Sequence, residues 1–402
     1  MVDERVLTEL DRRLAPVDAA RAAAYPGESP ARQPVHTCYV PADAVVPGLT
    51  TAWGGAALAA LDEHGLPELG LPAALVAEVL PRVRAKLAAE PVEDLRVDAE
   101  DGYLGGPDAE EGDVSRAAAV LAAETGLPPY LGVRAKSLEG PTRRRGVRSL
   151  DLFLGGLAGA GRERAIVTLP KVTDVEQVAA FLPVLDALEQ AHGLDLTLEL
   201  QVETPQAVLG ADGTTTLARM LHAGAGRVTG LHYGTYDYSA SLGIAAAHQS
   251  SDHPAADAAK QAMQVAVAGT GARAVDGSTN VLPVGDTAAV HAAWQLHARL
   301  VRRALERGFY QGWDLHPAQL VTRYVATYAF FRAALPAAAA RLDGYVHKVA
   351  GGVLDEPATA RALATVVLRG LDCGALDGGE VAAATGLGRT ELDRLAGRRP
   401  AA

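Results

Sequence analysis

The chain of 402 residues is poor in cysteine and in positive charge. It has two cysteines, Cys38 and Cys373, which are too few for a disulfide framework or for a zinc site built from cysteine ligands. Its formal net charge of −11 argues against a general nucleic-acid binder, because such proteins show a basic patch. Aromatic residues make up only 5% of the chain, so the core must depend on Ala, Val and Leu. We therefore expect no nucleic-acid partner.

Long apolar segments are also missing. No uninterrupted apolar run approaches the roughly 18 residues that a membrane-spanning helix needs. The first residues, MVDERVLTELDRRL, begin with charges and lack the apolar stretch of a signal peptide. We expect a soluble, cytoplasmic protein with no membrane partner.

Short strand candidates alternate with helical segments along most of the chain. The eight candidates lie at residues 34–41, 94–103, 130–137, 165–172, 196–204, 227–238, 272–284 and 311–320. Several of the helical segments between them end in glycine, a common helix stop. Eight parallel strands joined by helices close most simply as a (β/α)8 TIM barrel, an α/β fold. An open doubly wound sheet is the alternative, but no G-x-G-x-x-G turn follows the first strand.

This alternation divides the chain into three parts. Residues 1–34 form an N-terminal helical arm, amphipathic through Val6, Leu7, Leu10 and Leu14, and residues 35–320 form the barrel. Residues 321–402 form a helical C-terminal extension that is too short to hold a large core of its own. We expect it to pack on the barrel or on a neighbouring subunit, and we expect a homo-oligomer, a trimer or a hexamer.

Ionisable residues gather where the predicted strands end, whereas the strand interiors are expected to be apolar. Active sites of such barrels lie at the carboxyl ends of the strands. In strand order, these ends carry Asp98 and Asp101, Arg134, Lys171, Glu203, Tyr236 with Asp237, and His316. We expect these side chains to surround a site for a small molecule.

Two of these acids suggest a metal. Glu203 and Asp237 follow neighbouring parallel strands and would converge on one point, where a hard divalent cation such as Mg²⁺ could bind and keep waters for a substrate to displace. The alternative is that Glu203 caps a helix and Asp237 is a turn residue. A metal here could chelate a 2-keto acid and act as a Lewis acid. Arg134 could offset the developing oxyanion charge, or it could merely pair with Asp98 or Asp101.

The motifs VDAEDG, VRAK, TLPKV, VET, YGTYD and LHPAQ, in this order between Val35 and Leu320, resemble the HpcH/HpaI aldolase and citrate lyase superfamily. They are more similar to its citrate lyase beta-subunit, malyl-CoA lyase and malate synthase branch. The resemblance implies a (β/α)8 barrel, Mg²⁺ or Mn²⁺ on Glu203 and Asp237, and Arg134 at the substrate carbonyl. It also implies cleavage or formation of a carbon–carbon bond in a 2-keto acid such as glyoxylate or pyruvate, with a coenzyme A thioester as a candidate co-substrate.

The sequence departs from the superfamily in two places. The loop after the second strand lacks the catalytic histidine of the class II aldolases and carries acids instead, with Asp98 and Asp101 as catalytic candidates. In the tail, GVLDEPATARALATVVLRG resembles the malate synthase segment that supplies an acidic base, which would be Glu356 or its neighbour Asp355. Either acid could instead be an ordinary helix N-cap before Pro357.

Three further residues are candidates for contact with a substrate or cofactor, namely Lys171, Tyr236 and His316. Lys171 has a second possible role as a Schiff-base lysine, and His316 could instead shape the turn after the eighth strand. Two other functions stay open. One is a 4-hydroxy-2-keto acid aldolase that works without coenzyme A, and the other is a catalytically idle barrel with a role in assembly or regulation.

Overall fold

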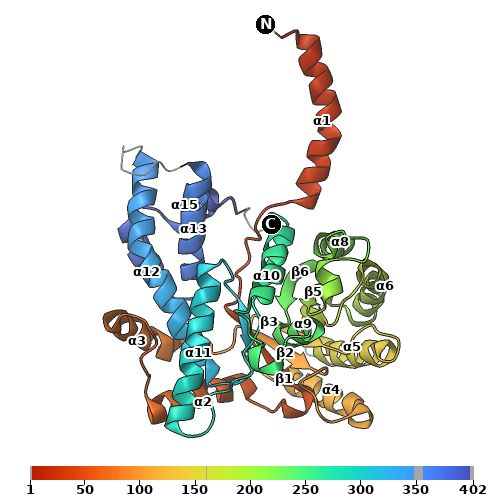
Figure 1. Ribbon diagram of the computed structural model, residues 1–402, viewed down its shortest axis with the longest axis vertical. Coiled ribbons are helices and arrows are strands. Elements are labelled where there is room, and N and C mark those ends of the chain that lie inside the picture. Colours follow the sequence, from red (N-terminus) through yellow and green to blue (C-terminus); the bar gives the residue numbers. More distant parts are fainter. Residues whose placement is uncertain (1, 160, 348–355, 399–402) are drawn as a thin grey trace.

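The computed structural model describes residues 2–159, 161–347 and 356–398 and contains one parallel sheet (Figure 1). Its eight strands are β1 His36–Pro41, β2 Asp94–Asp98, β3 Tyr130–Arg134, β4 Arg164–Leu169, β5 Asp195–Val202, β6 Val228–Tyr233, β7 Arg273–Val275 and β8 Gly312–Asp314. From β2 to β7, each strand pairs in parallel with the strand before it in the chain, and β8 pairs in parallel with β1. This order is that of a (β/α)8 barrel, so the predicted fold is confirmed.

The barrel is nearly closed between its last two strands. β7 and β8 stand at the two ends of the hydrogen-bonded strand order and are only three residues long. Beyond the strands themselves, the backbone N–H of Asp276 donates to the carbonyl of Gln311 at 2.9 Å. Other neighbouring strands are joined by a ladder of backbone hydrogen bonds, whereas this bond stands alone. The junction between β7 and β8 is therefore the weakest seam of the barrel.

Helices lie before, between and after the strands, and those between the strands surround the barrel (Figure 1). They are α1 Glu4–Ala24, α2 Leu49–His64, α3 Ala73–Ala89, α4 Pro107–Ala122, α5 Arg143–Ala158, α6 Val175–His192, α7 Pro205–Val208, α8 Thr216–Ala223, α9 Thr235–Ser241, α10 Pro254–Val267, α11 Thr287–Glu306, α12 Gln319–His347, α13 Pro357–Asp372, α14 Gly378–Thr385 and α15 Arg389–Ala396, with short 3-10 turns at Ala42–Ala44 and Ala246–His248. In the described part of the chain, no helix is long and apolar enough to cross a membrane.

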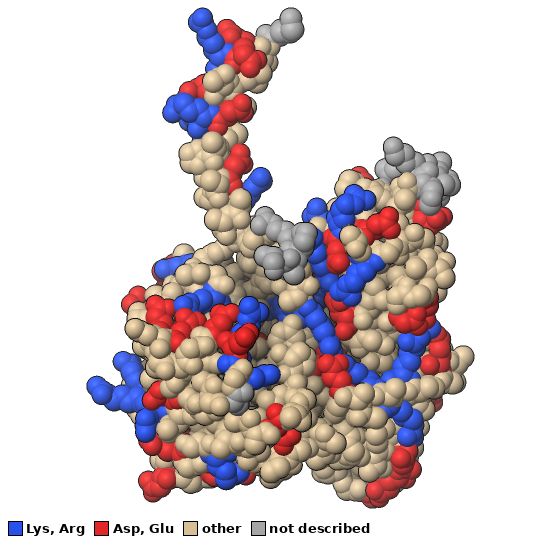
Figure 2. Space-filling view, turned by 180° about the vertical axis from the view of Figure 1, so that it is seen from behind, with Lys and Arg blue, Asp and Glu red and all other residues tan. Residues whose placement is uncertain are grey.

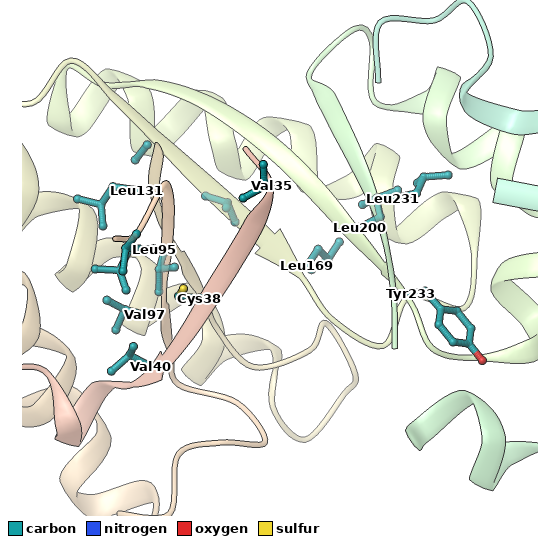
Figure 3. Close-up of a cluster of buried hydrophobic side chains, with 14 of the residues drawn as sticks. Val35, Cys38, Val40, Leu95, Val97, Leu131, Leu169, Leu200, Leu231 and Tyr233 are labelled. Atoms are coloured by element: carbon teal, nitrogen blue, oxygen red, sulfur yellow. The ribbon is translucent and has the colours of Figure 1, made fainter. Parts of the chain in front are cut away.

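The main core lies between the strands and the surrounding helices. Successive strand residues point to opposite faces, and the outward positions are apolar. Figure 3 shows several of them, including Cys38 and Val40 on β1, Leu95 and Val97 on β2, and Leu131 on β3. Cys38 and Cys373 are both free and buried.

The inward-facing positions differ from what the sequence predicted. Arg96 of β2 is fully buried and donates from Nη2 to Asp94 Oδ2 at 3.0 Å and to Glu199 Oε2 at 2.7 Å. Because β2 and β5 are not neighbours in the sheet, the contact with Glu199 crosses the interior of the barrel. A Cβ at Gly132 would lie 2.6 Å from Arg96 Nη1, so glycine there makes room for the guanidinium. The expectation of apolar strand interiors was therefore wrong for the inner face, which holds an ion-pair network.

The first and last described segments of the chain lie on the amino-terminal side of the barrel. Helix α1 projects from the body (Figure 1). The segment after it contacts the amino-terminal side of the barrel, where the Gly27 N–H donates to the carbonyl of Gly269 at 2.8 Å. Helices α12 to α15 share a small apolar cluster that includes Leu342, Leu368 and Leu392. Helix α12 also packs on α11, α3 and α2, which ties this extension to the barrel.

Candidate active site

A cavity of about 490 Å³ opens at the carboxyl ends of the strands. It brings together six of the residues predicted from the sequence, namely Asp98, Asp101, Arg134, Glu203, Tyr236 and Asp237. Tyr39, Pro41, Gly102, Gly234, Thr235, Ser278, Trp313 and Leu315 complete its lining. The cavity therefore lies where the strand ends were expected to form a site.

Glu203 and Asp237 reach this cavity from adjacent strands. Glu203 directly follows β5 and is buried, whereas Asp237 lies in the first turn of α9, shortly after β6. Burial raises the pKa of the Glu203 carboxyl to about 7, and the nearby Asp237 carboxylate adds to that rise against the opposing effect of Lys171 and Arg134. The two acids therefore lie close enough to influence one another electrostatically.

Lys171 contacts Glu203 through its backbone and Asp237 through its side chain. Its backbone has a φ of 51°, in the left-handed region, and its N–H donates to Glu203 Oε1 at 2.6 Å. Its ammonium donates to Asp237 Oδ2 at 2.7 Å and to Asp101 Oδ2 at 2.8 Å. Burial opposes the charge of Lys171, but the surrounding carboxylates, Glu203 foremost, outweigh it and raise the pKa of the ammonium. A lysine held in its charged form is a poor Schiff-base nucleophile.

Arg134 is held in one orientation by its neighbours. Its guanidinium donates to both oxygens of Asp98, at 2.7 and 2.5 Å, and lies 4.8 Å from the centre of the Tyr39 ring. The amide of Gln201 fits between Arg134 and Glu203, with its oxygen 3.0 Å from Arg134 Nη1 and its nitrogen 3.2 Å from Glu203 Oε1 in the orientation that satisfies both. Arg134 therefore both pairs with Asp98 and lines the cavity.

The donor set fits a hard divalent cation. Glu203 and Asp237 offer carboxylate oxygens, the ligands that Mg²⁺ and Mn²⁺ prefer, together with open room for water. A Cβ at Gly234 would lie 2.7 Å from Glu203 Oε2, so glycine keeps the space beside this oxygen clear. Within the described ranges, no group of three or more His, Cys, Asp or Glu residues could hold a metal ion. A site here would therefore rest on two protein carboxylates completed by water or substrate.

Three residues at the site were not among the candidates chosen from the sequence. Glu100 is buried beside Asp101, its Oε2 has no hydrogen-bond partner among the described residues, and burial raises its pKa to about 8. Tyr39 of β1 and Trp313 of β8 form aromatic walls, with ring centres 4.6 Å apart. Glu100 stands in the acid-rich loop and could have been found there. The aromatic residues could have been found only as inward positions of their strands.

The remaining candidates are placed differently. Tyr236 lines the cavity, but its hydroxyl accepts the N–H of Asn280 at 2.6 Å. His316 is not among the lining residues, and its Nδ1 accepts the N–H of Ala318 at 3.2 Å. This contact belongs to the turn between β8 and α12.

Of the two proposed bases of the tail, Glu356 does not line this cavity. Asp355 lies outside the described residues, and Glu356 is the exposed N-cap of α13. The 29 residues of α12 span about 43 Å and lead away from the mouth (Figure 1). Further along α13, Arg369 contacts Gln33, which precedes β1 on the amino-terminal side.

Solved structures with the same fold include enzymes. A citrate lyase from Burkholderia xenovorans is 20% identical, with 88% of this chain and 99% of that chain covered and a TM-score of 0.56. Native malate synthase from Haloferax volcanii at 3 mM glyoxylate is 14% identical, with 74% and 76% covered and a TM-score of 0.53. Protein CitE from Mycobacterium tuberculosis, in complex with magnesium, acetoacetate and coenzyme A, is 17% identical, with 86% and 99% covered and a TM-score of 0.51. At these identities the likeness establishes the fold, as the sequence motifs implied.

No curated protein matches the chain in sequence. One family model does match, over residues 14–400, and its description is domain of unknown function DUF6986. Because the match covers nearly the whole chain, the protein belongs to the DUF6986 family.

Proposed function

We propose that this protein is a Mg²⁺-dependent enzyme that cleaves or forms a carbon–carbon bond in a 2-keto acid such as glyoxylate or pyruvate, with a coenzyme A thioester as its second substrate. The observation that carries the proposal is the convergence of Glu203, Asp237 and Arg134 on one cavity at the carboxyl ends of the strands. Support also comes from the CitE structure with magnesium, acetoacetate and coenzyme A, and from the malate synthase with glyoxylate, which have this fold.

In this proposal Glu203 and Asp237 hold the metal ion, and Arg134 faces the keto acid. The bound ion supplies a Lewis acid for the oxygens of the substrate. The Arg134 guanidinium stabilises the negative charge that develops on the carbonyl oxygen. Asp98 keeps the guanidinium in place through its two hydrogen bonds, so its role is to position Arg134.

Lys171 balances charge in the same site. Glu203, Asp237 and Asp101 bring three negative charges, which the two charges of a divalent cation and the single charge of Lys171 cancel. An anionic keto acid then meets a neutral site, and like-charge repulsion does not exclude it. In this role Lys171 contributes charge to the site and forms no covalent bond with the substrate.

Proton transfer falls to the acids of the loop after β2. Of the described carboxylates that line the cavity, Asp101 is neither a proposed metal ligand nor the partner of Arg134. Glu100 lies beside it and takes up a proton more readily than an ordinary carboxyl. We assign the proton acceptor to this pair, because Glu356 does not lie at the mouth within one chain.

Binding of the metal is the first test. Isothermal titration with Mg²⁺, followed by glyoxylate or pyruvate, should give two successive binding events in the wild-type protein. Glu203→Ala and Asp237→Ala should each abolish the first event. Asp195→Ala is the matched control, because Asp195 begins the strand that Glu203 follows and is exposed at its opposite end. Equal Mg²⁺ binding in all four proteins would refute the metal assignment.

Activity is the second test. A Mg²⁺-dependent assay with acetyl-CoA and glyoxylate should show turnover, and Asp101→Asn should lower kcat by about 10²-fold or more while leaving Mg²⁺ binding intact. Turnover of 4-hydroxy-2-keto acids alone would favour the aldolase without coenzyme A. Binding of neither metal nor keto acid, with no activity, would favour the idle barrel.

A further inference from the structure

Helix α1 has no tertiary contacts that explain its stability. None of its residues is buried, and it projects from the body as a separate rod (Figures 1 and 2). Most helical stability in proteins comes from tertiary packing of an amphipathic face, and the 21 residues of α1 bury no such face. Pro16 inside the helix removes a hydrogen bond and weakens it further. The helix therefore needs a surface to pack against.

Four of the large apolar residues of α1 form a seam, and Val6 lies beside it at a g position. Leu7, Leu10, Leu14 and Val17 are spaced by three, four and three residues, which is the a and d pattern of a coiled coil. Their exposed fractions are 41%, 50%, 45% and 58%, respectively, although this spacing places them on one side of the helix. In the same pattern Pro16 is a c position, away from the seam. A second helix with the same a and d spacing could pack against this seam and bury its side chains.

Charges beside the seam indicate the partner and its direction. Asp11 and Asp18 occupy e positions, and Arg13 occupies a g position. In a parallel pair of α1 helices, Arg13 of each copy would face Asp18 of the other, whereas an antiparallel pair would bring the acidic e positions together. Arg13 makes no ion pair within the described residues, and Asp18 has only a 3.7 Å contact with Arg21. The charges thus complement a second, parallel copy of the same helix.

We propose that α1 is a self-association element, in which the seam Leu7–Leu10–Leu14–Val17 packs in parallel against α1 of a second copy of this chain. The barrels are joined at their amino-terminal sides in such an assembly, because α1 leaves the body there (Figure 1). Their catalytic mouths face away from the contact and stay open to substrate.

The oligomeric state of the full chain tests the seam. Light scattering after size exclusion should give a multiple of 41.6 kDa for the wild type and a lower mass for the double variant Leu10→Asp/Leu14→Asp. The control Thr8→Asp/Ala15→Asp changes the other side of the same helix and should keep the wild-type mass. An unchanged thermal midpoint of the body shows that the seam variant is folded. A monomeric wild type, or a seam variant with the wild-type mass, would overturn the proposal.

Crosslinking tests the direction. In a parallel pair the two copies of position 10 face one another, so Leu10→Cys should form a disulfide-linked dimer on mild oxidation. The native cysteines are buried and do not interfere. Thr8→Cys, outside the seam, should stay largely monomeric on a non-reducing gel. If Leu10→Cys failed to crosslink alone but crosslinked to Leu14→Cys in a mixture, the helices would be antiparallel and the proposed arrangement would be wrong.

Discussion

At the residue scale, Gly234 controls the space beside a proposed metal ligand. A methyl group there would lie 2.4 Å from Glu203 Cβ and 2.7 Å from its Oε2. Gly234→Ala should therefore displace the Glu203 carboxylate, reduce Mg²⁺ affinity at least tenfold and lower the free energy of unfolding by about 1–3 kcal/mol. Titration calorimetry and urea denaturation would measure these effects.

A second glycine supplies the control. Gly55 in α2 is exposed, and a Cβ there would meet nothing within 4 Å. Gly55→Ala should leave Mg²⁺ binding unchanged and stabilise the helix by up to about 1 kcal/mol. If Gly234→Ala behaved like Gly55→Ala, the close packing around Glu203 would be incorrect.

The buried carboxyl of Glu203 should make stability depend on pH. Burial raises its pKa from an ordinary 4.5 to about 7 in the folded protein. Between these values the unfolded chain has released its proton while the folded protein retains it, so the free energy of unfolding falls as pH rises. The loss should approach about 3 kcal/mol by pH 8 when no metal is bound.

Urea denaturation in EDTA at pH 5 and pH 8 would measure this loss. Glu203→Gln cannot titrate at this position and should lose correspondingly less stability over the same interval. An identical pH dependence in both proteins would mean that Glu203 does not carry the effect.

At the scale of elements, the seam between β7 and β8 depends on a buried ion pair. Lys260 of α10 donates to Asp276 Oδ1 at 2.8 Å, directly after β7. Lys260→Met would leave the Asp276 carboxylate buried without its partner, at a cost of about 3–5 kcal/mol. We also expect faster amide hydrogen exchange in β7 and β8 than in β4 and β5, where the ladder is continuous.

An exposed pair is the matched control for this variant. Arg299 on α11 pairs with Asp252 at 2.6 Å but is more than half exposed. Arg299→Met should therefore change the free energy of unfolding by less than about 1 kcal/mol. Equal effects of the two substitutions would show that the buried pair does not hold the seam.

At the scale of the whole molecule, α12 couples the barrel to the C-terminal extension. It contributes Tyr328 and Phe331 to the main core and Leu342 to the small cluster of the extension. Because that cluster is small, it should not unfold separately from the barrel. Leu342→Ala should therefore shift the same calorimetric transition as Leu185→Ala in the main core, each by about 2–5 kcal/mol. An early transition affected only by Leu342→Ala would contradict this coupling.

The sequence was most informative where local pattern and position along the chain suffice. Short strand candidates that alternate with helical segments predicted the eight strands, and their number predicted the barrel. It was less informative about the barrel interior. Arg96 and Glu199 pair across the interior, and Gly132 makes room for the Arg96 guanidinium. These residues are far apart in the sequence, so no local pattern indicates the contact.

Taken alone, the sequence determined which residues stand at the strand ends, because strand length and alternation are local properties. It therefore placed Glu203 and Asp237 on one rim. Only the tertiary structure decided which of these groups touch, such as Lys171 bridging both acids. It also carried Glu356 to the far end of α12, away from the mouth. Contacts of this kind depend on how the barrel closes and in which direction a long helix runs, and neither is encoded in a short stretch of chain.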